Sequence, residues 1–196
     1  MTYAVMTKPL IFAETFWKCR SFTPPRHPPH FCSALHKSNH YVGIQEPVDE
    51  KELNKETIWT FQDEIFYVRA VDPNKIMASS LSWDRSENEY KVVTFQIVLT
   101  SLDKYTFLNL KNENSASYSI YRVIPSTDGA LVVFTADKGN MKRHADEGKI
   151  KAIERDNSFI IESTKEDLDD YVLNNVNEIF DYSRAHIIKP LKGLKE

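Results

Sequence analysis

The stretch of residues 89–135 constrains the fold more than any other part of the chain. It holds three or four segments in which apolar and polar residues alternate, separated by short polar turns, with no helical period among them. In the longest segment Val93, Phe95, Ile97 and Leu99 fall on one face of a strand, and the residues between them fall on the other face. Because strand side chains alternate between two faces, this pattern predicts an antiparallel sheet.

Neighbouring segments extend the same pattern. Residues 57–61 and 65–71 predict one hairpin, residues 149–154 and 158–162 predict another, and residues 185–189 predict a last strand. About nine short strands at regular turn spacing favour a mainly β fold. We therefore expect an antiparallel lipocalin-like barrel or a sandwich of about eight or nine strands.

Two helices complete the prediction. Asp137 is a candidate N-cap for a short helix that stops at Gly148. A capping box over residues 163–166 opens a longer amphipathic helix towards the C-terminus, covering about residues 164–180. We expect this C-terminal helix to pack on the barrel wall or to close one of its ends.

The N-terminal part differs in character from the rest. The pairs Pro24-Pro25 and Pro28-Pro29 interrupt both helices and central strands. We therefore divide the chain into an irregular proline- and histidine-rich arm, residues 1–46, and one β-rich domain, residues 47–196. A chain of 196 residues is long enough to bury one sizeable core.

Charge and hydropathy exclude some classes of partner. The net charge of -3 and the absence of a long basic block give no reason to expect nucleic acid. No apolar run approaches the roughly 20 residues of a transmembrane helix. Residues 3–17 are fairly apolar but are interrupted by Lys8, Pro9 and Glu14. This segment is either the remnant of an export signal or an ordinary first strand or arm.

A cluster of metal-ligand types lies in the arm. Imidazole and thiolate are usual ligands of zinc and copper, so the cluster is a candidate zinc or copper site. The alternative is a polar arm that happens to be rich in histidine, since the spacing matches no established zinc module. The candidate ligands are His27, His30, Cys32, His36 and His40.

The chain contains two cysteines, Cys19 and Cys32. They are thirteen positions apart, so they could close one disulfide in an oxidising compartment. The alternative is two unrelated thiols.

Aromatic residues on the predicted strands suggest a pocket. Most of them are explained by core packing, but an eight-stranded barrel can also hold one small ligand. A strand cation could meet an acidic ligand or a buried carboxylate. The candidate pocket residues are Trp59, Tyr67, Trp83, Tyr105 and Arg122.

No catalytic residue can be named from the sequence. It contains no G-x-S-x-G elbow, no glycine-rich phosphate loop and no H-E-x-x-H motif. Adjacent carboxylates on a predicted helix, such as Asp169-Asp170, point to different faces and are typical of a charged surface. The sequence therefore favours a non-enzymatic role over an enzymatic one.

The order of segments resembles a group of uncharacterised bacterial cell-envelope proteins, often lipoproteins, with a lipocalin-like barrel. The matching pieces are residues 106–110, 118–123, 129–135, 147–152 and 163–173. The resemblance implies a location in the cell envelope or periplasm, and it implies no known activity.

True lipocalins are less similar. Their Gly-x-Trp motif on the first strand has a glycine here, Gly43, but Gln45 stands in place of the tryptophan. We therefore expect a non-enzymatic, envelope-associated barrel that binds a small apolar ligand or a protein partner. A zinc- or copper-binding protein and an enzyme whose site is assembled from separated strands are the two alternatives.

Overall fold

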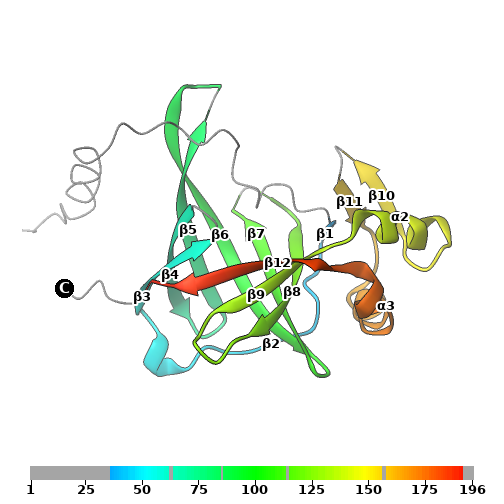
Figure 1. Ribbon diagram of the computed structural model, residues 1–196, viewed down its shortest axis with the longest axis horizontal. Helices are drawn as coiled ribbons and strands as arrows, with labels where there is room; N and C mark the ends of the chain where they lie inside the picture. Colours follow the sequence, from blue (N-terminus) through cyan, green and yellow to red (C-terminus); the bar gives the residue numbers. More distant parts are fainter. Residues whose placement is uncertain (1–35, 62–63, 85, 114, 156–157, 192–196) are drawn as a thin grey trace, which may run out of the picture.

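Eight antiparallel strands close into a barrel in the computed structural model of the chain (Figure 1). The structure describes residues 36–61, 64–84, 86–113, 115–155 and 158–191. Strands β3 to β9 follow one another around the barrel, and β12 closes it between β9 and β3. The bounds are β3 Glu56–Phe61, β4 Glu64–Asp72, β5 Lys75–Asp84, β6 Glu89–Leu102, β7 Tyr105–Asn112, β8 Tyr118–Pro125, β9 Leu131–Ala136 and β12 Phe180–Pro190.

The predicted mainly β barrel is confirmed, and its register explains why the alternation in β6 was informative. Ile97 lies between Ile76 of β5 and Leu110 of β7. Paired residues share a face of the sheet, so this row of side chains points into the barrel. Phe95 and Leu99 lie on the same face of β6, two residues away on either side.

A small extension continues the sheet beyond the barrel. Strand β1 (His36–Ser38) pairs antiparallel with β8 and parallel with β11 (Ser158–Ile161), which forms a hairpin with β10 (Ala152–Arg155). Strand β2 (Ile44–Gln45) pairs with the end of β6. Residues 36–45 of the predicted irregular arm thus contribute two strands, because their backbone groups find partners on the barrel.

The helices lie close to where the sequence predicts them. Helix α2 (Lys138–Asp146) is capped by Asp137, whose Oδ1 accepts from the Asn140 amide at 2.9 Å. Helix α3 (Lys165–Ile179) is capped by Thr164, one residue later than the predicted capping box begins. A 3₁₀ turn, η2 (Glu50–Glu52), precedes the barrel. Among the described residues, no helix is long and apolar enough to cross a membrane.

Two hydrophobic cores lie on opposite faces of the same wall. The inner core lies inside the barrel and includes Leu108, Tyr121 and Val133. The outer core lies between strands β7–β9 and the two helices, and includes Phe107 and Phe134. Figure 1 shows α2, α3, β10 and β11 together on one side of the barrel.

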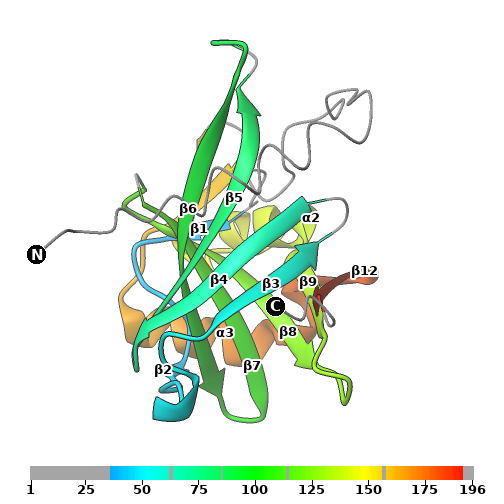
Figure 2. The same cartoon turned by 90° about the vertical axis from the view of Figure 1, so that its left-hand side faces the viewer.

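One hairpin projects from the barrel. Figure 2 shows β5 and β6 extending past the other strands at one end. On this projection Trp83 and Tyr90 pack edge to face, with ring centroids 4.8 Å apart. Lys91 lies 2.9 Å from Asp84 and from Glu87, so ion pairs accompany the aromatic pair.

Candidate ligand cavity

The barrel encloses a cavity of about 250 Å³. Strands β3 to β7 contribute two or three inward side chains each, and β9 and β12 contribute one each. Every described lining residue is hydrophobic. The lining residues are Trp59, Phe61, Phe66, Val68, Ile76, Ala78, Phe95, Ile97, Leu99, Leu108, Leu110, Leu131 and Ile188.

The cavity opens at the end of the barrel that holds the turns at 73–74, 103–104 and 126–130. Ile76 is the second residue of β5 and Leu131 is the first residue of β9, just after two of these turns, and both are half-buried. Leu99, near the end of β6, is also half-buried. We conclude that solvent reaches the cavity from this end, which we call the mouth.

The opposite end of the cavity is closed by aromatic side chains. Phe61, Phe66 and Phe95 are buried and line the deep part of the cavity. The ring of His186, on β12, packs against Phe61 with centroids 5.4 Å apart. A ligand that enters at the mouth would therefore end against a wall of rings.

Trp59 carries the one polar atom among the described side chains of the lining, and that atom already has a partner. Its indole Nε1–H donates to Thr57 Oγ1 at 2.9 Å, and the Thr57 hydroxyl itself donates to the Val68 carbonyl at 3.3 Å. The hydrogen bond holds the ring in place at the cavity wall. The described lining thus has no unused hydrogen-bond donor or acceptor on a side chain.

The five residues predicted for a pocket are distributed over the molecule. Trp59 lines the cavity. Tyr67 lies on the exposed outer face of β4, where burial of its ring and the neighbouring Glu56 raise its pKa to about 12. Trp83 lies on the projecting hairpin. The structure does not bring these three residues together.

Arg122 and Tyr105 lie together, but on the outer face of the wall. Arg122 pairs in register with Phe107 and Phe134, which both belong to the outer core. Its Nη1 donates to the Thr106 carbonyl at 2.9 Å, and its guanidinium lies 5.0 Å from the centre of the Tyr105 ring. Burial lowers the pKa of Arg122. This cation covers an edge of the outer core.

Sequence reasoning missed most of the cavity because most of its lining is aliphatic. Ala78 and Leu108 have no chemistry that marks a site. The signal that could have found them is register: Phe95, Ile97 and Leu99 share the predicted face of β6, and all three line the cavity.

The predicted metal ligands and disulfide lie mostly outside the described residues. This applies to Cys19, His27, His30 and Cys32, and to the side chain of His36. His40 is exposed. Within the part of the chain that the structure describes, no three His, Cys, Asp or Glu side chains gather as a metal site would require.

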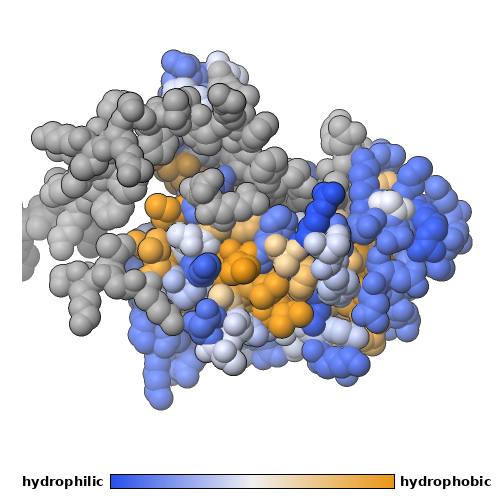
Figure 3. All heavy atoms as spheres, in the orientation of Figure 1, coloured by the Kyte–Doolittle hydropathy of each residue, from blue (hydrophilic) through white to orange (hydrophobic). Residues whose placement is uncertain are grey.

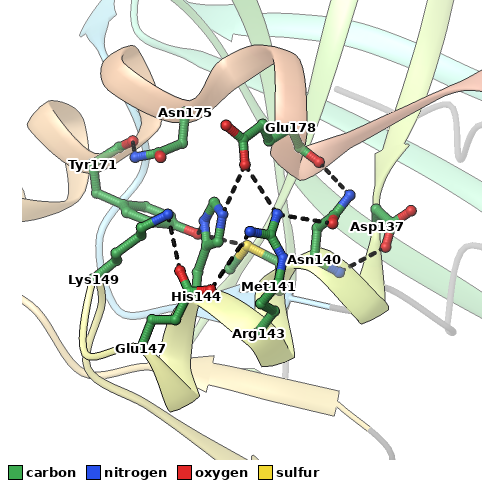
Figure 4. Close-up of polar contacts among 10 residues, drawn as sticks. All are labelled: Asp137, Asn140, Met141, Arg143, His144, Glu147, Lys149, Tyr171, Asn175 and Glu178. Atoms are coloured by element: carbon green, nitrogen blue, oxygen red, sulfur yellow. Dashed lines mark hydrogen bonds and ion pairs between the residues drawn. The ribbon is translucent and has the colours of Figure 1, made fainter.

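A second polar feature joins the two helices (Figure 4). His144 of α2 is 0% exposed. Its Nδ1 lies 3.0 Å from the Tyr171 hydroxyl, and its Nε2 lies 3.1 Å from Glu178 Oε2. The same carboxylate oxygen accepts from Arg143 at 3.0 Å, and the Tyr171 hydroxyl lies 3.1 Å from Met141 Sδ.

In this cluster of three residues, His144 lies between Tyr171 and Glu178, as a histidine does in an acid–base relay, but solvent and substrates cannot reach its buried ring. An ionised carboxylate only accepts, so Nε2 of His144 carries a proton. Burial raises the pKa of Tyr171. Arg143 and then His144 hold the pKa of Glu178 below its usual value. Because the ring and the hydroxyl are buried, a substrate could not touch them, and the cluster clamps α2 to α3.

The outer wall also carries an exposed apolar row. Ile124, Val132 and Ile187 are directly paired across β8, β9 and β12, and the two isoleucines are exposed. Figure 3 shows hydrophobic atoms gathered at the centre of this face, beside the hydrophilic helical side. Apolar patches of this kind are typical of surfaces that contact other proteins.

Comparisons of the chain with known protein families, with curated proteins and with solved structures found no match. The cavity and its chemistry are therefore the basis for assigning a function.

Proposed function

We propose that the protein binds one small apolar molecule inside its barrel. The observation that carries this proposal is a cavity of about 250 Å³ whose described lining is entirely hydrophobic. Protein interiors are otherwise packed as densely as organic crystals, with few voids larger than a water molecule. A void of this size is thus a feature that needs a reason.

The chemistry of the lining supports an organic ligand over water. A buried water needs two to four polar partners, whereas an apolar cavity of about 150 Å³ stays dry and binds benzene. The described side chains here offer no free polar group to a water molecule. An apolar ligand would restore the contacts that the lining side chains lack across the void.

Binding of naphthalene tests the proposal. A ligand that binds only the folded state raises its stability, by about 1.4 kcal/mol at ten times its dissociation constant. We expect a concentration-dependent rise in melting temperature, together with a change in fluorescence from Trp59 at the cavity wall. Absence of both up to the solubility limit of naphthalene would contradict the proposal.

Two matched variants show where the ligand binds. Ala78→Leu places three further carbon atoms in the cavity, and we expect it to abolish the naphthalene effect. Ser79→Leu makes a similar enlargement at the next residue of β5, which points to the outer face. We expect that variant to bind naphthalene as the wild type does.

The resemblance to cell-envelope proteins adds a setting to this proposal. We propose that binding takes place in the envelope, and fractionation of cells that express the full chain would test that location. No comparable observation among the described residues favours a metal-binding or catalytic role.

A further inference from the structure

We propose that the cavity selects an uncharged, compact ligand and rejects anionic amphiphiles such as short fatty acids. This inference rests on the proposed function, because it names the class of molecule that the same cavity accepts. Four features of the cavity support it: its apolar deep end, its lack of a free hydrogen-bond donor, the carboxylate at its mouth and its small volume.

The described lining of the deep end presents no charged side chain, although Glu64 and His186 take inward positions of β4 and β12 nearby without lining the cavity. Phe61, Phe66, Phe95 and Leu110 line the deep end, and all four are buried. An ionised group that leaves water for such a site loses its hydration and gains nothing in exchange. A charged ligand would therefore have to leave its head group at the mouth.

The middle of the cavity offers no donor to a carboxylate. The one candidate donor, the indole N–H of Trp59, already donates to Thr57 Oγ1. A ligand carboxylate that took this donor would leave the Thr57 hydroxyl without its indole partner. A polar head group thus gains no net hydrogen bond by entering as far as Trp59.

The mouth carries a carboxylate and, at its inward-facing strand positions, no described cation. Ser101 follows Leu99 on the inward face of β6, and its hydroxyl donates to Glu46 Oε1 at 2.5 Å. The Glu46 amide donates to the Leu99 carbonyl at 3.1 Å, which fixes that residue beside the opening. Other described inward positions at this end hold no cation either; they include Thr57, Ala70, Thr106, Pro125 and Pro190.

An anionic head group at the mouth would therefore face Glu46. Fatty-acid recognition needs the opposite arrangement, in which an arginine or lysine pairs with the carboxylate. Arg122, the half-buried cation of the barrel wall, points to the outer face. It cannot serve the cavity from there.

Volume limits the size of the ligand. A water molecule, which is close to a methylene group in size, takes up about 30 Å³ of liquid. A cavity of about 250 Å³ thus holds roughly eight such groups. It lies below the range of about 300–1,000 Å³ that is usual for drug-sized ligands, so we expect a single short chain or one small ring system.

The experiment compares two probes with the same chain and different head groups. Binding of 1-octanol and of sodium octanoate is measured by calorimetry at pH 7 and low salt, with naphthalene as the reference ligand. We expect 1-octanol to bind and to compete with naphthalene, and octanoate to bind about tenfold more weakly or worse. Ala78→Leu should abolish the binding of 1-octanol.

A variant at the mouth tests the role of the carboxylate. Glu46→Lys reverses the charge there without changing the lining, and we expect it to raise the affinity for octanoate several-fold while leaving 1-octanol unchanged. Glu46→Gln removes the charge only and should give an intermediate affinity for octanoate.

The outcomes separate the inference from the proposed function. If octanoate binds the wild type as tightly as 1-octanol does, selection for uncharged ligands is overturned while apolar binding stands. If octanoate is weak but unaffected by Glu46→Lys, the role of the mouth is overturned. If neither naphthalene nor 1-octanol binds, the proposed function fails, and the inference fails with it.

Discussion

The inner and outer cores use the same strands and are built differently. On β7, Phe107 points to the outer core and its neighbour Leu108 points to the cavity. The outer core is sealed by helices and contains buried polar groups with partners, such as His144 and Asn109. The inner core is built from hydrophobic residues, with Tyr121 among them, and encloses a void whose described lining is entirely hydrophobic.

The difference shows that voids on the outer face of the barrel wall can be removed by repacking, whereas voids on the inner face cannot. Helices can shift against a sheet until their side chains interdigitate. A closed barrel has a width fixed by strand number and stagger, so its opposite walls cannot approach one another. A void therefore persists where the backbone cannot collapse, and side chains too small to fill it, such as Ala78, leave space for a ligand.

The largest effect is expected when one phenylalanine in each core is replaced by alanine. Phe107→Ala should cost about 3–5 kcal/mol, because the ring is fully packed. Phe95→Ala should cost at least about 1 kcal/mol less, because one side of that ring already faces the void and lacks contacts to lose. Urea denaturation of both variants measures the difference. Equal costs would mean that the inner core is as tightly packed as the outer one.

The next effect concerns the buried amide of Asn109. Its Oδ1 accepts from the Val42 amide at 3.0 Å, and its Nδ2 donates to Val98 O and Thr100 Oγ1. Asn109→Ala leaves these groups unpaired, and we expect a loss of about 2–3 kcal/mol in the free energy of unfolding. Asn175→Ala, which removes one helical contact to Tyr171, is the control and should cost below about 1 kcal/mol. A loss at Asn109 no larger than the control would show that the outer core does not depend on this network.

Replacing an alanine by valine should have a smaller effect on stability, with opposite sign in the two cores. Ala78 and Ala136 are strand residues with 4% and 8% exposure, the first at the cavity and the second in the outer core. Ala78→Val places two methyl groups in empty space and should stabilise the protein by up to about 1 kcal/mol. Ala136→Val overpacks a filled region and should cost about 1–3 kcal/mol. Thermal unfolding of both variants measures the two changes in melting temperature. Changes of the same sign would contradict the proposed difference in packing between the two cores.

Much of the barrel could be predicted because strand alternation is a local property. The faces of β6 follow from residues 93–99 alone, and the caps of both helices follow from Asp137 and from the Ser163–Glu166 stretch to within one residue. Local steric and hydrogen-bonding rules decide these features, so a single sequence contains them.

Most of the lining of the cavity could not be predicted, because it depends on how the sheet closes. Whether Arg122 points in or out follows from its pairing with Phe134, 12 residues away along the chain, and from the helices that cover that face. The cavity depends on Leu131 and Ile188, which meet only because β12 closes the barrel. Volume, too, is a property of the assembled walls and has no local signature.

The smallest effect is a pH dependence confined to the outer side. Arg143 and His144 lower the pKa of Glu178 in the folded state, so its contribution to stability is present above the pKa of the unfolded chain, about 4.3. It is lost as the pH falls through the lower folded value. We therefore expect wild type to be more stable than Glu178→Gln at pH 7, with a gap that closes towards pH 3.

Chemical denaturation of the two proteins between pH 7 and pH 3 measures that gap. Asp146→Asn, at an exposed carboxylate 3.6 Å from Lys142, serves as control and should differ little from wild type throughout. Binding of 1-octanol should not change between pH 7 and pH 5, since the described lining of the cavity holds no titratable group. A gap that stayed constant with pH would show that the cluster of His144, Tyr171 and Glu178 does not stabilise the outer side through charge.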